Sequence, residues 1–151
     1  MSSNNTSQIQ PAPSVSEPTP LRSIRAIISD LSKPVNAQRL KVRTEERRNK
    51  RTGETTKIEL RYIPWYQAVR YLDNYAPGWR YEIRSVNQIG ASLVMVARII
   101  IPCAEGEAWR EASALEPIEG NGFGDPATNA ESAALRRAAA KFGLCLNLYD
   151  K

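Results

Sequence analysis

The sequence predicts an α+β fold in which an antiparallel sheet, made of a basic β-hairpin and a three-stranded meander, carries packed helices. Alternating apolar and polar residues, interrupted by turn residues, predict strands within 38–63 and 79–115. Apolar residues spaced three and four positions apart predict helices at 21–32, at 64–75 and near the C-terminus. The order of these segments favours helices packed on one face of the sheet.

The first 20 residues are rich in Ser, Asn, Gln and Pro and contain few apolar residues. Such a segment buries too little apolar surface to offset its ordering entropy, so we predict a disordered tail at 1–20 and one folded domain at 21–151. All 21 Lys and Arg residues lie in this domain, and the whole chain has a net charge of +5. A basic domain favours an anionic partner, with nucleic acid first and an acidic membrane second.

The composition offers little for catalysis. The chain has no histidine, which removes the usual general base near neutral pH and the commonest metal ligand. Its two cysteines, Cys103 and Cys145, lack the spacing of a metal site and are expected to be buried thiols in a reducing compartment. We therefore expect no catalytic residue, metal or cofactor. With no signal-peptide pattern and no run of ~20 apolar residues, the sequence predicts a cytoplasmic protein without membrane contact.

The segment 21–32 predicts a short helix that ends before Pro34. Its apolar face packs either on its own core or on a neighbouring subunit. The residues of this face are Leu21, Ile24, Ile28 and Leu31.

The segment 38–63 predicts a hairpin around the turn sequence NKRTGE. Leu40 and Val42 alternate with basic residues on the first strand. Apolar residues alternate on the return strand at Ile58, Leu60 and Tyr62. The tip carries Arg47, Arg48, Lys50 and Arg51. A solvated hairpin end and a basic finger along a polyanion fit this tip equally well.

The segment 64–75 predicts a helix that begins with Pro64 at its first position. Its expected core stripe consists of Trp65, Ala68, Val69 and Leu72. The other faces carry Tyr66, Gln67, Arg70 and Asn74. Tyr66 and Tyr75 remain candidates for stacking on bases, whereas Trp65 is expected in the core. Three strands are then expected at 79–86, 92–101 and 108–115.

The stretch GNGFGDPATNAESAALRRAAAKFG combines alternating glycines with a helix. No strand leads into these glycines in a βαβ unit and no Lys-Ser or Lys-Thr pair follows, which excludes a P-loop. The helix start is expected to be capped by a protein carboxylate or hydroxyl. Either Asp125 caps with Pro126 at the first position, or Thr128 caps with Glu131 reaching back.

The last helix combines an apolar stripe with a basic face. The stripe is formed by Leu135, Ala138, Ala139 and Phe142. Arg136, Arg137 and Lys141 lie on the opposite arc, with the small residues Ala133 and Ala140 between them. Small residues would let a partner approach closely, and guanidinium groups bind phosphates in a bidentate manner. This pattern favours phosphate contact over an ordinary solvated face.

Two stretches, ALRRAAAKFGLCLNLYDK and YIPWYQAVRYLDNYAPGWRYEI, resemble the Rad52-type single-strand annealing family. The run GFGDPATNAESAALRRAAAKFGL is the most specific part, and the resemblance covers about residues 21–151. It is nearest to the bacterial branch that contains DdrA, to which phage Sak-type annealing proteins are related. The resemblance implies large homo-oligomeric rings or helices that hold single-stranded DNA by its sugar–phosphate backbone in a basic groove, without nucleotide hydrolysis.

The resemblance also implies a role in DNA repair and recombination at the nucleoid. The expected partners are single-stranded DNA, including its 3′ ends, and a single-strand-binding protein or a recombinase. The family's basic pair falls at Arg136 and Arg137, but a further basic position one turn on is Ala140 here, beside Lys141. A basic position early in the first core helix falls at Gln67, with Arg70 one turn away.

The second, outer DNA site of eukaryotic members is not matched, because its basic cluster would fall in the acidic segment 125–131. The longer basic hairpin tip is a substitute. The expected DNA-binding residues are therefore Tyr66, Gln67, Arg70, Arg136, Arg137, Lys141 and the tip residues Arg47, Arg48, Lys50 and Arg51.

Three other classes of protein remain as alternatives. A double-stranded RNA-binding module shares the order helix, three strands, helix, but it needs lysines where this chain has the acidic sequence GDPATNAE. A magnesium-dependent nuclease needs paired carboxylates, and no spacing among the available ones demands a shared metal. These carboxylates are Asp73, Glu105, Glu107, Glu111 and Asp125. The third class is a purely structural oligomer.

Overall fold

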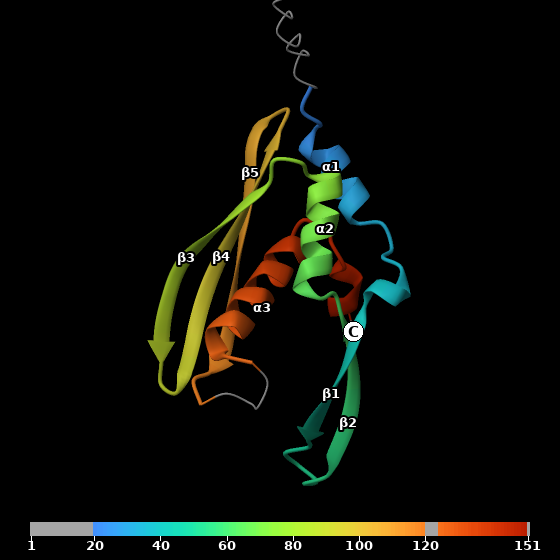
Figure 1. The fold of residues 1–151 in the computed structure, drawn as a ribbon. Coiled ribbons are helices and arrows are strands. Elements are labelled where there is room, and N and C mark those ends of the chain that lie inside the picture. Colours follow the sequence, from blue (N-terminus) through green and yellow to red (C-terminus); the bar gives the residue numbers. More distant parts are fainter. Residues whose placement is uncertain (1–19, 120–123, 151) are drawn as a thin grey trace, which may run out of the picture.

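The computed structural model describes residues 20–119 and 124–150, so the predicted tail lies almost wholly outside the described residues (Figure 1). Two short 3₁₀ helices lie at Ala37–Arg39 and Leu146–Tyr149. The helices and strands, in chain order, are α1 (Ile24–Leu31), β1 (Lys41–Arg48), β2 (Thr55–Tyr62), α2 (Trp65–Tyr75), β3 (Arg80–Ile89), β4 (Ser92–Cys103), β5 (Gly106–Pro117) and α3 (Pro126–Ala140). The predicted α+β class is confirmed.

The strands form two separate antiparallel sheets. β1 and β2 make a two-stranded hairpin, and β3, β4 and β5 make a three-stranded sheet in that order. The hairpin and the meander were predicted, but they do not join into one hydrogen-bonded sheet. Figure 1 shows the hairpin extending away from the rest of the molecule. Its outer part is therefore open to solvent on both faces.

α3 lies across one face of the three-stranded sheet (Figure 1). The contact is made largely by alanines: Ala97 and Ala114 of the sheet are buried with Ala134 of α3. Side chains this small let the helix backbone approach the strands closely. The close approach fixes the depth and direction of the helix relative to β4 and β5.

The main core lies where α1, α2, α3 and the sheet meet. Fully buried side chains from each of these elements form one cluster, with Phe142 as its largest member. The predicted stripe of α3 is confirmed, because Leu135, Ala138, Ala139 and Phe142 all belong to this cluster. α1 also packs on the core of its own chain, through Ile27 and Leu31.

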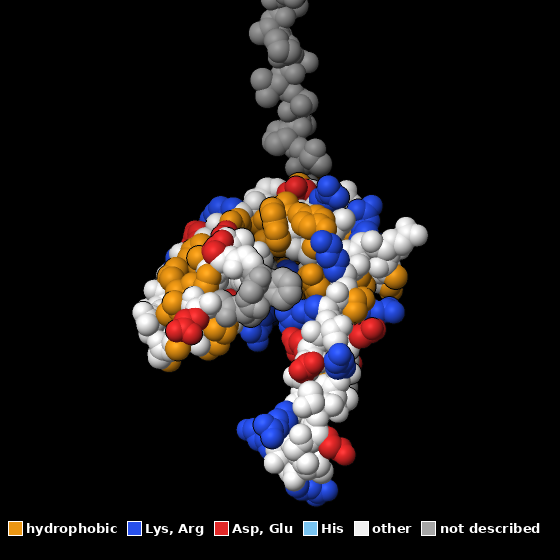
Figure 2. Space-filling view, turned by 60° about the horizontal axis from the view of Figure 1, so that its bottom comes forward, with side chains coloured by type: hydrophobic (Ala, Val, Ile, Leu, Met, Phe, Trp, Pro, Cys, Tyr) orange, Lys and Arg blue, Asp and Glu red, His pale blue; other side chains and the backbone are white. Residues whose placement is uncertain are grey.

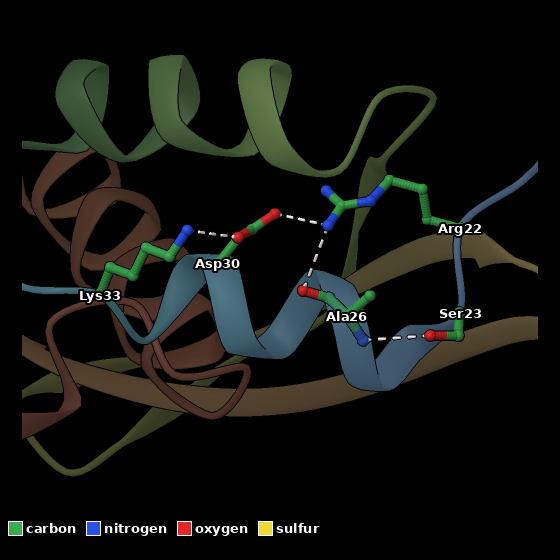
Figure 3. Close-up of polar contacts among 5 residues, drawn as sticks. All are labelled: Arg22, Ser23, Ala26, Asp30 and Lys33. Carbon is green, nitrogen blue, oxygen red and sulfur yellow. Dashed lines mark hydrogen bonds and ion pairs between the residues drawn. The ribbon is translucent and has the colours of Figure 1, made fainter.

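Polar contacts hold α1 in place (Figure 3). The Ser23 hydroxyl accepts a hydrogen bond from the backbone N–H of Ala26 at 3.1 Å and caps the helix. Asp30 accepts from Lys33 at 2.8 Å and from Arg22 at 2.5 Å, and these two bonds lower the pKa of its carboxyl. The Glu105 carboxylate, in the turn between β4 and β5, accepts from the backbone N–H of Ile24 at 2.9 Å.

The structure corrects three details of the helices. Trp65 was expected in the core, but 50% of its surface is exposed, because it lies in the first turn of α2 on the side away from the core. Pro64 is the N-cap of α2 rather than its first helical residue. Ala140 is 4% exposed, because it faces the protein interior and offers no outer surface to a partner.

The strand boundaries also differ from the prediction. All three strands of the meander are longer than expected, since β3 continues to Ile89, β4 to Cys103 and β5 begins at Gly106. Several residues predicted as turns, within 87–90 and 102–107, pair across the sheet instead, as Pro102 does with Glu107. The predicted turns are therefore too long, because proline and glycine near the strand ends are typical of turns.

The start of α3 settles one open alternative. Asp125 is the N-cap, and its carboxylate accepts hydrogen bonds from the Thr128 hydroxyl at 2.7 Å and the Thr128 backbone N–H at 2.8 Å. These bonds lower the pKa of the Asp125 carboxyl. Pro126 occupies the first helical turn, as predicted. Gly120 and Gly122 lie outside the described residues.

A substitution at Gly143 tests how closely the end of α1 packs against the end of α3. Its φ is +106°, and a Cβ at this position would lie 2.1 Å from the Ser32 Oγ. We expect Gly143→Ala to lower the free energy of unfolding by about 1–3 kcal/mol from backbone strain, with a further loss from the clash. Chemical denaturation measures this change.

The control is Gly53→Ala, because Gly53 has a φ of +75° but no atom near its Cβ position. It should show the strain alone. Adding Ser32→Ala to Gly143→Ala should recover part of the loss. Equal losses at Gly143 and Gly53 would contradict the close packing described here.

Candidate nucleic-acid interface

A groove runs between the hairpin and the body of the molecule. Its walls come from β1, β2, the end of β5, α3 and the C-terminal segment, and its volume is about 390 Å³. This volume lies within the range of ~300–1,000 Å³ that is usual for ligand sites. Of the described residues, five arginines and two glutamates line the groove: Arg43, Arg47, Arg61, Arg136, Arg137, Glu45 and Glu116. We call this feature the arginine groove.

Figure 2 shows Lys and Arg side chains in the hollow between the hairpin and the body, and again at the end of the hairpin. The hollow is open to solvent along one side in this view. A cleft lined mainly by positive side chains raises the local concentration of anions, because its low-dielectric walls focus the electric field of those charges.

The hairpin contributes cations because of its strand periodicity. Lys41, Arg43 and Arg47 occupy alternate positions of β1 with Glu45, so all four project from the same face. They pair across the hairpin with β2 residues of the same face, including Tyr62 and Leu60. The alternate face carries Val42, which is 55% exposed. Three of the four cations of β1, and not its apolar residue, therefore share the face that lines the groove.

Arg136 is the central cation of the groove. Its guanidinium carbon lies 5.0 Å from the centre of the Tyr62 ring, and its Nε donates to the carbonyl of Ser132 at 3.2 Å. Burial lowers the pKa of Arg136, and the nearby charge of Arg43 lowers it further. An arginine keeps its proton despite such a shift.

No carboxylate forms an ion pair with Arg136 within residues 20–119 and 124–150. A partly buried cation without a paired anion is electrostatically costly. The carboxylate of Glu45 pairs instead with Arg43, at 2.7 Å. Arg136 is therefore a position in the groove where an external anion would be stabilised.

The side chains of Arg137, in α3, and of Lys141, just after it, extend toward the outer edge of the sheet. β5 is an edge strand, and Arg137 donates to the carbonyl of Ser113 at 3.0 Å while Lys141 donates to that of Glu111 at 2.5 Å. Arg110 in turn donates to the carbonyl of Lys141. The predicted pair Arg136–Arg137 thus lines the groove together, whereas Lys141 lies at the strand edge and outside the groove lining.

The tip residues are divided between the two faces of the hairpin. Arg47 lines the groove, and Arg48, the next residue along β1, projects from the opposite face. Lys50 and Arg51 lie in the turn and are exposed. Only one of the four predicted tip cations therefore belongs to the groove itself.

The other predicted residues form a cluster at the start of α2. The ring of Tyr66 lies 5.4 Å from the Lys41 Nζ and 6.0 Å from the guanidinium carbon of Arg70. A hydrogen bond with Tyr66 raises the pKa of Lys41. Gln67 accepts a hydrogen bond from Arg39 at 3.1 Å. Lys41 connects this cluster to the arginine groove, because it shares a face of β1 with Arg43.

Three cations on the meander are paired with neighbouring carboxylates. Arg80 pairs with Glu107 at 2.9 Å, and Arg98 pairs with Glu111 at 2.6 Å. Arg84 lies between two carboxylates and pairs more closely with Glu82, at 3.0 Å. These pairs leave little net charge on that surface. The cations along the groove and at the start of α2 differ from these, since Arg136, Lys41 and Arg70 have no carboxylate ion pair within the described residues.

Sequence reasoning missed several members of the groove. Arg43 and Lys41 have a signal in the sequence, since cations alternate along β1, but the prediction of a strand rests on its apolar residues. Arg61 and Tyr62 have no such signal, because they lie about 75 residues from Arg136 in the sequence and no local pattern indicates that they are close in space. No group of three or more His, Cys, Asp or Glu side chains suited to a metal occurs in the described ranges.

No helix in the described part of the chain is long and apolar enough to span a membrane. The groove places several arginines in a row along an open surface. Proteins that bind a polyanion through its backbone use this arrangement, so the geometry is that of a polyanion-binding domain.

Comparison with known proteins gives the family. The chain belongs to the Rad52/22 family of double-strand break repair proteins, whose model matches residues 23–151. Membership places it among DNA-repair proteins and implies that it binds DNA.

Two relatives come from Arabidopsis thaliana. The chain is 30% identical over 132 residues to DNA repair RAD52-like protein 1, mitochondrial. The aligned region covers 86% of this chain and 69% of the relative. The chain is 42% identical over 91 residues to DNA repair RAD52-like protein 2, chloroplastic. Here the aligned region covers 60% of this chain and 46% of the relative. The chain therefore spans less than half the length of the second relative.

Cys145 tests the packing at the inner wall of the groove. It is 5% exposed, and burial raises the pKa of its thiol to about 11. Because only the thiolate reacts, a shift from 9.0 to about 11 lowers its population at pH 8 about 100-fold. We expect slow modification of Cys145 by a thiol reagent, with a rate that rises about tenfold per pH unit up to the pKa.

Mass spectrometry of the modified peptides follows Cys145 separately from Cys103. Denatured protein is the control, in which both thiols should react at the rate of a free cysteine. Fast modification of Cys145 in the folded protein at pH 8 would contradict the closed wall.

Proposed function

We propose that this chain binds single-stranded DNA along the arginine groove and promotes the annealing of complementary strands in DNA repair and recombination. The observation that carries the proposal is the partly buried Arg136, which stands in an open groove with four further arginines and has no carboxylate paired to it in the described residues. Phosphate groups suit this site because arginine binds them through two parallel hydrogen bonds.

The proposed contacts follow the backbone of the strand. Arg136, Arg137, Arg43 and Arg47 hold phosphates in the groove, and Lys41 and Arg70 continue the path toward α2. Arg48, Lys50 and Arg51 extend it at the hairpin tip, while Gln67 and Lys141 provide polar contacts at its margins. Backbone contacts leave base edges free to search for a complementary strand.

The proposed mechanism needs many weak contacts rather than a chemical step. We propose that subunits assemble into a large ring, so that phosphate contacts add along one strand and no nucleotide is hydrolysed. Free strands and 3′ ends are the proposed substrates, and a single-strand-binding protein or a recombinase is the proposed protein partner. The specific run GFGDPATNAESAALRRAAAKFGL supports a place in the branch of bacterial DdrA and phage Sak-type proteins, at the nucleoid.

The proposal is tested by fluorescence anisotropy with single-stranded DNA, duplex DNA and duplex RNA of equal length over a salt series. Light scattering gives the oligomer size, and a labelled pair of complementary strands gives the annealing rate. We expect a large oligomer that prefers the single strand, binds it less tightly as salt rises, and accelerates annealing without a nucleotide. A small species that prefers duplex RNA would support the double-stranded RNA-binding alternative.

The site within this function is tested by Arg136→Gln/Arg137→Gln. Each lost phosphate contact should reduce the slope of log affinity against log salt by about 0.7 for a single strand. We therefore expect a shallower slope and an affinity at low salt that falls roughly tenfold or more, since each charge-assisted hydrogen bond contributes about 1.5–3 kcal/mol.

The matched control is Arg25→Gln/Arg84→Gln, which removes the same charge outside the groove. Arg25 is exposed on α1, and Arg84 belongs to a solvent-exposed ion pair of the kind that contributes little stability. The control should keep its affinity nearly unchanged. Equal effects of the two double substitutions would show that net charge, and not the groove, governs binding.

A further inference from the structure

The first turn of α2 exposes two adjacent aromatic side chains. Trp65 has 50% of its surface exposed and Tyr66 has 37%. Their ring centres lie 6.0 Å apart in an edge-to-face arrangement, with 84° between the ring planes. Such a pair covers one face of one ring at most, so aromatic surface remains open to solvent.

The other two tryptophans have partners that account for their positions. The Trp79 indole N–H donates to the Asp73 carboxylate at 2.6 Å, and its ring stacks on Tyr81. The ring of Trp109 is covered by the guanidinium of Arg98, at 3.9 Å from the ring centre. Trp65 has an edge-to-face contact with Tyr66, and among the described residues no cation lies over its ring. Its exposure therefore has no structural explanation inside the subunit.

The charge around this aromatic pair is positive. Lys41 and Arg70 both lie beside the Tyr66 ring, and Arg39 donates a hydrogen bond to Gln67 in the same turn. None of these three cations has a carboxylate ion-pair partner in the part of the chain that the structure describes. Aromatic rings among unpaired cations match the chemistry of a nucleotide, with a flat base and a charged phosphate.

The aromatic pair is also continuous with the arginine groove. Lys41 pairs with Tyr62 across the hairpin, and Tyr62 packs against Arg136 in the groove. Trp65 follows Tyr62 by three residues and opens the next helix. A strand whose phosphates lie along the groove would therefore reach this turn of α2 at one end.

We propose that Trp65 stacks on an unpaired nucleobase of the bound strand, with Tyr66 as its supporting ring, and so selects single strands over duplexes. This inference rests on the proposed function, and it adds a contact to a base. Phosphate contacts are sequence-independent and occur with duplexes too, so the arginines alone give weak discrimination. In a duplex both faces of a base are already stacked, and only a free strand offers one to Trp65.

The experiment compares Trp65→Ala with Trp109→Ala, whose tryptophan is similarly exposed but lies on the three-stranded sheet. Each variant is tested by anisotropy against oligothymidine, against an oligonucleotide of the same length and charge that lacks bases, and against duplex DNA. Thermal unfolding and light scattering check that fold and oligomer size are kept. Because Trp65 is exposed and alanine favours helices, Trp65→Ala should fold normally.

We expect Trp65→Ala to bind oligothymidine roughly 5- to 150-fold more weakly, the factor that ~1–3 kcal/mol of base stacking represents. Its affinity for the abasic strand and for the duplex should stay within about twofold of the wild-type values. Trp65→Phe should restore much of the loss. Oligothymidine should quench tryptophan fluorescence in the wild type and in Trp109→Ala, and this quenching should be largely absent in Trp65→Phe.

Several results would overturn the inference. Equal wild-type affinity for the normal and abasic strands, or equal losses on single strand and duplex in Trp65→Ala, would exclude base stacking while leaving the groove intact. A smaller oligomer in Trp65→Ala with unchanged affinity per site would assign Trp65 to a subunit contact. Absence of DNA binding in the wild-type protein would instead refute the proposed function, and the stacking contact with it.

Discussion

The arrangement of charge in this protein depends on the alanine contact between α3 and the three-stranded sheet. Ala97, Ala114 and Ala134 meet where larger side chains would hold the helix away from the strands. Because α3 lies so close to the sheet, the long side chains on its flank extend past β5 and toward the hairpin. A larger residue at one of these positions would raise the helix and move Arg136 away from Tyr62. The small residues of α3 therefore place its cations, although they do not themselves form an outer binding surface.

The same geometry separates two kinds of basic residue. Beside α1 and on the meander, several cations pair with carboxylates, as Arg22 does with Asp30 and Arg98 does with Glu111. Along the hairpin face and the start of α2, carboxylates are few and aromatic rings take their place beside the cations. A net charge of +5 therefore understates the local field, because its positive excess is not spread evenly. Membership of a DNA-repair family is consistent with the unpaired cations along the groove and at the start of α2.

Local sequence patterns predicted the elements of this fold well, but not their assembly. The hairpin, the meander and the stripe of α3 each have a periodicity that can be recognised within one segment. The separation of the two sheets cannot be recognised in this way, because it depends on contacts between distant segments. The arginine pair was found because it lies on one helix turn, whereas Arg61 and Tyr62 reach the same site only through folding. Trp65 was misassigned because helical periodicity places a residue on a face, while the first turn of a helix can project beyond the core.

The bonds from Arg137 and Lys141 to the edge of β5 have a consequence for self-association. Free carbonyl and N–H groups on an edge strand are a template for adding strands from other chains, which is a common route to aggregation. Two carbonyls of β5, at Glu111 and Ser113, already accept hydrogen bonds from Lys141, just after α3, and from Arg137 of α3. β3 forms the opposite edge of the sheet, so the two edges differ. Pairing of β3 with β3 joins two copies and then stops, because it leaves only the protected edges outward. Open-ended stacking of sheets through both edges is thereby disfavoured.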